Sequence, residues 1–360
     1  MRVLVWQWGR YGAGPRFAAE LARSLGRVPG TEAWLSLAAG AEILRTRNPP
    51  ACDLPVQTYS GSLGFLARMA LSPLARPALV ARLRALAPDV AICAMPAPLD
   101  LAMAAALRQA GIPFVVVVHD ADPHPGDRFP LQIVLQRALA RRAAALVALS
   151  GHVADRLRQQ RVGAGRPLLR ASLPPFVFGP RPPPPLAHGG PFRLLSFGRL
   201  LPYKGLDLLA DGLQRLGARP DLEVRVVGLG PEGAVLDGLR RLPGVSVENR
   251  WVPEDEVGAL VAWADGLVLP YREASQSGVA ATAVAARRWL VATAVGGLAE
   301  QLRGEPLALL CDPAADSIAA GLARVLLLAG QAPAAAADAQ DAWREVAETL
   351  VADIAATLRA

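Results

Sequence analysis

The chain contains a single lysine, Lys204, among 38 lysines and arginines. It lies five residues after Arg199, in Gly-Arg-Leu-Leu-Pro-Tyr-Lys-Gly, where a predicted strand and a Gly198-containing loop lead into a helix. Arginine can hold two phosphate oxygens with its planar fork, whereas lysine supplies a compact and movable charge. A helix that begins near Gly205 would add the positive end of its dipole. The spacing predicts a diphosphate site; the alternative is a solvated surface lysine.

The second glycine motif is Gly228-Leu-Gly-Pro-Glu-Gly233, which follows a predicted strand and precedes a helix, with Glu248 further along. This pattern can be a dinucleotide-binding fingerprint, which would make the chain an NAD-dependent oxidoreductase. A tight turn between any strand and helix has the same pattern, and Pro231 is typical of a first helical turn. Gly228 and Gly230 are therefore candidate ligand-binding residues, with a tight turn as the structural alternative.

A polar loop, Leu269-Pro-Tyr-Arg-Glu-Ala-Ser-Gln-Ser-Gly-Val279, follows another predicted strand. Ser277 opens an alanine-rich helix, so the backbone amides of Gly278 and Val279 could bind phosphate. Glu273 could bind sugar hydroxyls, or it could be a solvated loop acid.

Histidines gather in the first half of the chain. Three of the four, His119, His124 and His152, fall within 34 residues, near Asp120, Asp122 and Asp127. They could hold a metal ion, or His119 could contact its own neighbours in a loop. The first strand is followed by Gly12-Ala-Gly14, which could let a ligand approach the backbone or could be a plain turn.

Composition limits the classes of function. The net charge of +7 and the pI near 10.1 favour anionic ligands. The basic residues are spread along the chain without a nucleic-acid-binding motif, so we expect no nucleic-acid partner. Three cysteines without metal spacing suit a reducing compartment. We find neither a signal-peptide pattern nor an uninterrupted apolar stretch of about 18 residues, so we expect a cytoplasmic protein.

Short apolar runs alternate with helical stretches along the chain, which predicts an α/β protein with doubly wound parallel sheets. In the first half we predict strands at 3–6, 34–37, 90–93, 114–118 and 145–149, and a helix carrying Phe17, Leu21 and Leu25. In the second half we predict strands at 193–197, 222–227, 245–248, 267–269, 290–293 and 308–310.

The 360 residues suffice for two domains. We expect a first Rossmann-like domain over 1–173 and a stiff, proline-rich linker over 174–190. A second Rossmann-like domain follows over 191–335, and a C-terminal helix over 336–360 that crosses back to the first. The two domains should face a central cleft, with ligands beyond the carboxyl ends of the strands.

Four motifs of the second half occur in the order of a known family: Gly198-Arg-Leu-Leu-Pro-Tyr-Lys-Gly, Val-Val-Gly-Leu-Gly-Pro, Ala264-Asp-Gly-Leu-Val-Leu-Pro-Tyr and Val291-Ala-Thr-Ala-Val-Gly-Gly-Leu-Ala-Glu. Residues 193–303 resemble the C-terminal domain of retaining GT-B glycosyltransferases of family 4. The N-terminal half is similar more loosely, through its glycine loop and Val-His119-Asp120.

The resemblance implies a hexosyltransferase without a metal cofactor. It takes a nucleotide diphosphate sugar as donor, bound mainly by the second domain, and a polysaccharide or lipid-linked glycan as acceptor. Arg199 and Lys204 would neutralise the diphosphate, and Glu273 would contact the donor sugar. His119 would approach that sugar from the first domain, and Arg250-Trp251-Val252 falls where the family holds the base.

One departure from the family pattern concerns its second glutamate. Eight residues after Glu273 the expected position is Ala281, whereas alignment on the following helix gives Thr282 or Ala283. None of these residues carries a carboxylate. That acid normally holds the ribose. The chain therefore resembles a subgroup with a Ser-Gln-Ser-Gly-Val loop, and a non-catalytic nucleotide- or glycan-binding protein on the same scaffold is the alternative.

Residues 62–84 combine leucines with Arg68, Arg76, Arg82 and Arg84. A basic amphipathic surface of this kind could rest on the anionic inner face of the plasma membrane. Buried helices with solvated arginines are the alternative.

Overall fold

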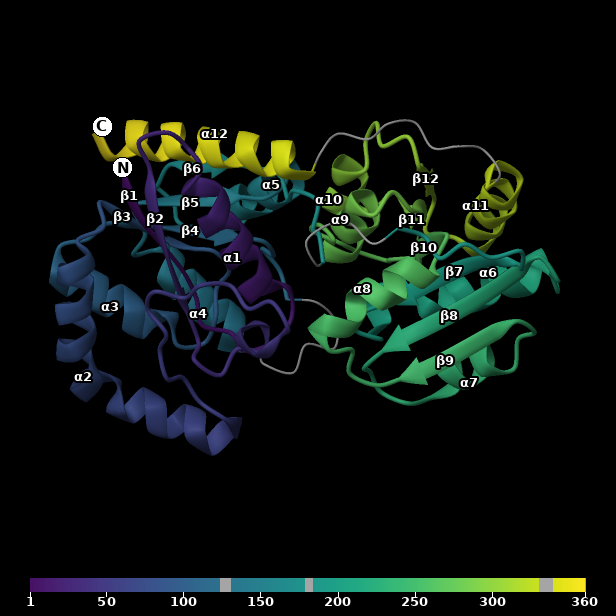
Figure 1. Ribbon diagram of the computed structural model, residues 1–360, viewed down its shortest axis with the longest axis horizontal. Coiled ribbons are helices and arrows are strands. Elements are labelled where there is room, and N and C mark those ends of the chain that lie inside the picture. The colour runs from purple at the N-terminus through teal and green to yellow at the C-terminus, as the bar shows by residue number, and fades with distance from the viewer. Residues whose placement is uncertain (124–130, 179–183, 330–338, 360) are drawn as a thin grey trace. The chain divides into compact units, whose positions relative to one another are not determined.

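The computed structural model describes residues 1–123, 131–178, 184–329 and 339–359. These residues form two compact units (Figure 1). Among the described residues, unit 1 comprises 1–123, 131–172 and 340–359, and unit 2 comprises 173–178, 184–329 and 339. Each unit has its own parallel sheet and is described by itself.

Unit 1 is built on a parallel sheet with strand order β2-β1-β3-β4-β5-β6. Its strands are β1 (Arg2–Gln7), β2 (Glu32–Leu37), β3 (Val90–Cys93), β4 (Phe114–Val118), β5 (Ala145–Ala148) and β6 (Leu168–Arg170). All five residues of β4, Phe-Val-Val-Val-Val, are buried. A strand covered by helices on both faces needs apolar residues at every position, so this run belongs in the middle of the sheet.

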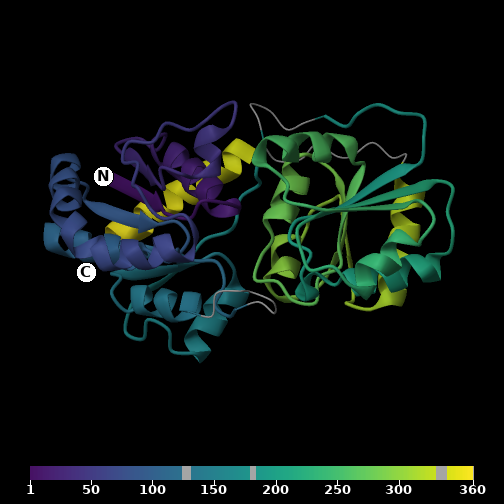
Figure 2. The same ribbon diagram turned by 90° about the horizontal axis from the view of Figure 1, so that it is seen from below.

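Helices cover the sheet of unit 1: α1 (Ala13–Leu25), α2 (Gly61–Leu86), α3 (Asp100–Ala110), α4 (Leu131–Ala140), α5 (Gly151–Gln159) and α12 (Ala339–Arg359), with a 3-10 turn at Glu42–Arg45. The predicted face of α1 is fully buried, since Phe17, Leu21 and Leu25 are all 0% exposed. The last helix, α12, packs on α1 (Figure 2), and the rings of Trp343 and Phe17 lie 5.6 Å apart.

Unit 2 repeats this plan with strand order β12-β11-β10-β7-β8-β9. Its strands are β7 (Phe192–Phe197), β8 (Leu222–Gly228), β9 (Val245–Asn249), β10 (Gly266–Leu269), β11 (Trp289–Thr293) and β12 (Ala308–Cys311). Its helices are α6 (Leu206–Leu216), α7 (Ala234–Arg240), α8 (Glu254–Trp263), α9 (Gly278–Ala285), α10 (Gly296–Gln301) and α11 (Ala315–Leu328). A 3-10 turn at Pro202–Lys204 precedes α6. The predicted α/β fold of two Rossmann-like domains is confirmed.

The proline-rich segment that we expected as a stiff linker packs on unit 2 over its described part. Phe176 is buried, and its amide donates to the carbonyl of Ala281 at 3.2 Å. Further along the segment, His188 Nε2 lies 2.9 Å from a carboxylate oxygen of Asp265. Phe176 and His188 attach the segment to α9 and to the start of β10, which proline content alone does not indicate.

Candidate functional site

The candidate site of unit 2 lies where its strand order reverses. The chain begins the sheet at β7, adds β8 and β9 on one side, and returns to add β10 on the other. Loops that follow two such strands leave in opposite directions, which opens a crevice at their carboxyl ends. The loop after β7 carries Arg199 and Lys204, and the loop after β10 carries Glu273 and Ser277. Two of the predicted motifs therefore lie at the same edge of the sheet.

Tyr271 joins these two loops. The Lys204 ammonium lies over the ring of Tyr271, 3.7 Å from its centroid, and 5.0 Å from that of Tyr203. Arg199 donates from Nη2 to the hydroxyl of Tyr203 at 2.8 Å. Tyr271 is buried, and this burial raises its pKa to about 12, so its ring stays neutral beneath the ammonium. The two predicted phosphate ligands are thus held on a pair of aromatic rings.

Ser277 caps the N-terminus of α9. Its hydroxyl accepts the amide of Ala280 at 3.2 Å and lies 3.5 Å from the hydroxyl of Tyr271. Gln301 holds the Ser277 backbone from both sides, by accepting its amide at 2.8 Å and donating to its carbonyl at 3.0 Å. The amides of Gly278 and Val279 have no acceptor within the helix, because they belong to its first turn. These are the amides that we predicted as phosphate donors.

Glycines let the two loops approach each other. Gly205 has φ +65°, and a Cβ there would lie 1.8 Å from the carbonyl oxygen of Pro270. Next to it, the amide of Arg272 donates to the carbonyl of Tyr203 at 2.8 Å. Only a residue without a side chain fits at position 205, so the sequence Lys-Gly is needed to bring Lys204 against the β10 loop.

Glu273 is exposed on the β10 loop, between two anchored residues. On one side, Arg272 forms an ion pair with Asp207. On the other, the carbonyl of Ala274 accepts the amide of Gly297 at 2.9 Å. The loop therefore holds the exposed Glu273 on a backbone that is fixed on both sides.

Gly228 and Gly230 have a structural role. A Cβ on Gly228 would lie 1.7 Å from the carbonyl oxygen of Gly198, and one on Gly230 would lie 2.1 Å from that of Leu200. The amide of Leu200 also donates to the carbonyl of Leu229 at 3.0 Å. These glycines let the β8 loop pack on the β7 loop that carries Arg199. This contact explains the motif without a bound dinucleotide.

Arg250 is engaged by acids of its own unit. Its guanidinium donates to Glu248 at 3.0 Å and to Glu256 at 2.9 Å, and these carboxylates raise its pKa. Its amide donates to the carbonyl of Gly228 at 2.8 Å. Trp251 beside it is 41% exposed. A partly exposed aromatic ring thus lies beside a fixed backbone here, whereas the Arg250 charge is already compensated.

The three positions that could have carried a second glutamate lie inside α9. Ala281, Thr282 and Ala283 are buried, and the Thr282 hydroxyl donates to the carbonyl of Gly278 at 2.8 Å. None of the three offers a free polar group in place of the missing acid.

In unit 1 the strand order reverses between β1 and β3. Gly12 precedes α1 with φ +82°, and Gly14 lies in its first turn. A Cβ on Gly14 would lie 2.7 Å from the side-chain nitrogen of Gln7, which is buried at the end of β1. Gly14 is therefore explained by packing, and Gly12 by its left-handed conformation.

His119 follows β4 at the carboxyl edge of the sheet. Its Nε2 lies 3.0 Å from a carboxylate oxygen of Asp120, while its buried Nδ1 has no hydrogen-bond partner among the described residues. Contact with its own neighbour is the arrangement that we gave as the alternative to sugar binding.

The histidine cluster is described only in part. His124 and Asp127 lie outside the described residues. Asp122 accepts from Arg156 Nε at 2.8 Å and from Gln160 at 2.6 Å, and His152 is exposed on α5. In the part of the chain that the structure describes, no three histidines, cysteines or acids are grouped for metal binding.

Two family models match the chain one after the other. The model described as Glycosyltransferase Family 4 matches residues 15–168, and that described as Glycosyl transferases group 1 matches residues 191–327. Together they cover most of both units. The chain belongs to the group 1, family 4 glycosyltransferases. A search of curated proteins finds no match.

Solved structures share the GT-B fold of this glycosyltransferase at low sequence identity. Anabaena HepE in complex with UDP-glucose has a TM-score of 0.67 at 18% identity, covering 98% of this chain and 100% of that one. Sucrose-phosphate synthase from Thermosynechococcus elongatus has a TM-score of 0.65 at 16% identity, covering 99% of this chain and 96% of that one. A glycosyltransferase from Rickettsia africae has a TM-score of 0.66 at 15% identity, covering 99% of this chain and 97% of that one.

In the glycosyltransferase the Tyr271 ring is expected to position Lys204. Tyr271→Phe keeps the ring beneath the ammonium and should retain most of the turnover. Tyr271→Leu removes the ring's negative face and should lower turnover by about tenfold, since a partly desolvated cation–π contact is worth about 1–2 kcal/mol. Steady-state kinetics on both variants measure the difference, with thermal melts as the control for folding. Equal losses in the two variants would show that the ring's charge distribution does not matter.

Asp100 of the glycosyltransferase is a buried acid that we did not predict. It lies at the start of α3, after β3, and is 1% exposed. Its carboxylate accepts from Trp6 Nε1 at 3.2 Å and from the Ala97 amide at 2.6 Å, and Cys93 Sγ lies 3.3 Å away. Burial raises its pKa to about 7, although these donors act in the opposite direction. An acid at the start of the helix that follows a buried strand is the signal that could have identified it.

The free energy of unfolding should therefore fall as the pH rises from about 4 to about 7. Folded Asp100 holds its proton over this range, whereas the unfolded chain, with an ordinary carboxyl pKa, has released it. The folded state binds more protons, so rising pH favours unfolding, by up to about 4 kcal/mol. Urea unfolding at a series of pH values should show this slope, and Asp100→Asn should flatten it. An identical slope in both proteins would contradict the assignment.

Proposed function

We propose that this glycosyltransferase moves a hexose-type sugar from a nucleotide diphosphate sugar to a polysaccharide or lipid-linked glycan, with retention of configuration. The observation that carries the proposal is the arrangement at the carboxyl ends of β7 and β10. There Lys204 lies 3.7 Å from the ring centroid of Tyr271, whose hydroxyl lies 3.5 Å from that of Ser277 at the start of α9. Two cations and a helix N-terminus at one edge suit a diphosphate.

In the proposed reaction the bond between the sugar's anomeric carbon and the diphosphate oxygen breaks. Arg199, Lys204 and the amides of Gly278 and Val279 stabilise the charge that develops on the leaving diphosphate, an effect worth several kcal/mol. The acceptor hydroxyl attacks the anomeric carbon from the face that the diphosphate leaves, and its proton passes to the departing phosphate oxygen. Glu273 binds hydroxyls of the transferred sugar.

The proposal includes no metal cofactor. Arg199 and Lys204 supply the positive charge that a divalent ion supplies in other phosphate sites. We assign contact with the donor sugar to His119 and the base to the segment Arg250–Trp251, through its backbone and the exposed indole. The solved structures of Anabaena HepE with UDP and UDP-glucose support a nucleotide sugar as the donor.

We place the enzyme in the cytoplasm, in peripheral contact with the anionic inner face of the plasma membrane. Lipid-linked and envelope acceptors are presented at that face. The net charge of +7 supports this location.

A non-catalytic binding protein on the same scaffold is the second candidate. It is favoured by the buried Ala281, Thr282 and Ala283, which offer no carboxylate for the ribose.

A panel of nucleotide sugars tests both candidates. A ligand that binds only the folded protein raises the apparent Tm by mass action, so the true donor should raise it by several degrees. UDP-glucose, UDP and NAD are the first probes. Release of nucleotide diphosphate from the bound donor identifies an enzyme, and binding without release identifies a binding protein. A response to NAD alone would overturn the proposal, and an anomeric NMR assignment of the product tests retention.

A further inference from the structure

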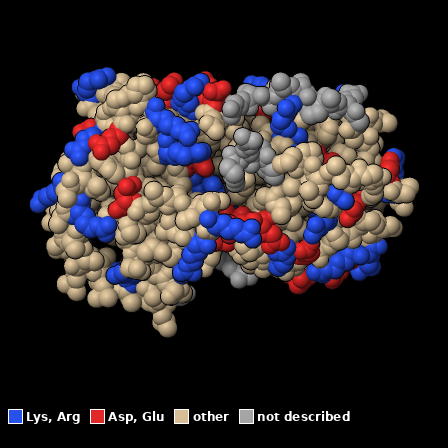
Figure 3. All heavy atoms as spheres, viewed as in Figure 1, with Lys and Arg blue, Asp and Glu red and all other residues tan. Residues whose placement is uncertain are grey.

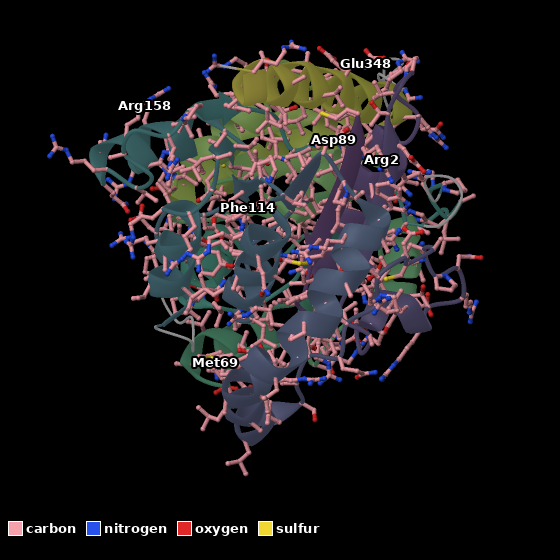
Figure 4. The ribbon with its side chains drawn as sticks, turned by 90° about the vertical axis from the view of Figure 1, so that its left-hand side faces the viewer. Arg2, Met69, Asp89, Phe114, Arg158 and Glu348 are labelled. Carbon is pink, nitrogen blue, oxygen red and sulfur yellow. The ribbon has the colours of Figure 1, made fainter. Side chains whose placement is uncertain are left out.

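The exposed face of helix α2 is apolar. Leu63, Leu66 and Leu74 are 83%, 62% and 78% exposed, and Met69 and Leu71 are about half exposed. Every exposed residue between positions 63 and 78 is alanine, leucine, methionine or proline. Figure 4 shows Met69 on the end of α2 that projects from the rest of unit 1.

The polar residues of this stretch are turned the other way. Arg68, Ser72 and Arg76 are half-buried, and Arg68 Nε donates to the carbonyl of Thr58 at 3.1 Å. Phe65 lies on the same side, with its ring 5.1 Å from that of Tyr59. A surface helix of a soluble domain normally has its apolar residues toward the core and its charges toward water. The first half of α2 has the opposite arrangement, which is typical of an interaction surface.

The charges around this apolar face indicate which kind of partner it contacts. No aspartate or glutamate occurs between Asp53 and Asp89, whereas α2 carries four arginines, at 68, 76, 82 and 84. In Figure 3 the surface over α2, at the lower left, is predominantly tan with blue at its border and little red. An apolar face bordered by cations and free of acids complements an anionic lipid surface.

Helix α2 has the composition of a membrane-spanning helix, but part of it is packed in the core of unit 1 and cannot cross a membrane. Among the described residues, α2 is the one helix long and apolar enough to cross a bilayer. Its second half packs in the core of unit 1, where Val80 and Leu83 are buried. Crossing takes about 20 residues. Only residues 63–78 are available, and Pro73 and Pro77 lie within them.

We propose that the first half of α2 lies in the interface of an anionic membrane, with Leu63, Leu66 and Leu74 at the acyl boundary. Arg82 and Arg84, which are exposed on the second half of the helix, contact lipid headgroups. This inference gives the membrane contact of the proposed function its surface, and it holds whichever acceptor is used.

Sedimentation of the full chain with vesicles tests the proposal. The protein should bind vesicles of phosphatidylcholine and phosphatidylglycerol in equal parts and should bind pure phosphatidylcholine weakly. Leu74→Gln should weaken binding about tenfold, and the triple variant Leu63→Gln, Leu66→Gln, Leu74→Gln about 100-fold or more. Arg82→Gln should weaken it about fivefold and lessen its salt dependence.

The matched control is Leu327→Gln on α11, whose leucine is also 83% exposed. This variant should bind as the unchanged protein does. Equal binding by the triple variant would overturn the proposal, and so would a dimer that forms through these leucines and ignores vesicles. Release of nucleotide from a soluble donor, measured without vesicles, should be the same in all variants, which separates a failure of docking from a failure of the transfer reaction.

Discussion

Replacement of Lys204 by alanine is expected to lower turnover by about 100-fold or more, since removal of one preorganised group that stabilises developing charge costs about 100- to 1,000-fold. The ammonium is held 3.7 Å from the centroid of the Tyr271 ring, at the strand edge where the diphosphate would leave. Its charge is needed most when the leaving group gains charge. The loss should therefore appear in kcat as well as in kcat/KM, measured as nucleotide release from the donor.

Arg215→Ala is the matched control for this loss. Arg215 is an exposed cation near the other end of α6, where it pairs with Asp316 at 2.7 Å. It should leave turnover near that of the unchanged enzyme. A Lys204→Ala variant with a near-normal rate would remove Lys204 from the reaction and with it the main support for the proposed diphosphate site.

Gly205→Ala is expected to cost about 3 kcal/mol or more of stability, from backbone overlap and a left-handed conformation together. The new Cβ would lie 1.8 Å from the Pro270 carbonyl oxygen, which belongs to backbone and cannot turn away. The melting transition of unit 2 should fall by about 10 °C. Because the overlap pushes the β7 and β10 loops apart, the donor should bind more weakly as well.

Gly111→Ala separates the effect of a left-handed backbone conformation from that of overlap with a neighbouring backbone atom. Gly111 ends α3 with φ +77° and ψ +18°, close to the conformation of Gly205, but no atom lies within 4 Å of its added Cβ. Its substitution should cost only about 1–2 kcal/mol, the penalty of a left-handed alanine. Equal losses of stability at the two positions would contradict the close approach of the loops.

The strands could be predicted well because parallel strands buried on both faces are continuous apolar runs. Residues 90–93 and 114–118 are strands with the predicted bounds. β6 was missed, because Leu168–Arg170 is only three residues long and lies at the sheet edge, where Arg170 is exposed. Short edge strands are defined by the neighbour that they pair with, which local pattern does not show.

The site could be predicted only as far as its motifs. The order of Arg199, Lys204 and Ser277 along the chain identified the two loops, and the fold brings them to one edge. The partners of Lys204 and Gly205 could not be predicted, because the Tyr271 ring and the Pro270 carbonyl lie more than 60 residues away along the chain. Gly228 and Gly230 illustrate the same limit, since their motif does not reveal which backbone they approach. Arg250 is a further example, because the turn after β9 decides that its guanidinium meets Glu248 and Glu256.

The single lysine lies over the ring of Tyr271. Its position allows a spectroscopic probe to be attached beside that ring without any mutation. Apart from the amino terminus, Lys204 carries the only primary amine in the chain. Reductive methylation with isotope-enriched formaldehyde would place a single side-chain label there and keep its positive charge. The ring current of Tyr271 should shift that resonance away from its free-solution position. Each nucleotide sugar could then be followed by one NMR signal as it occupies the site.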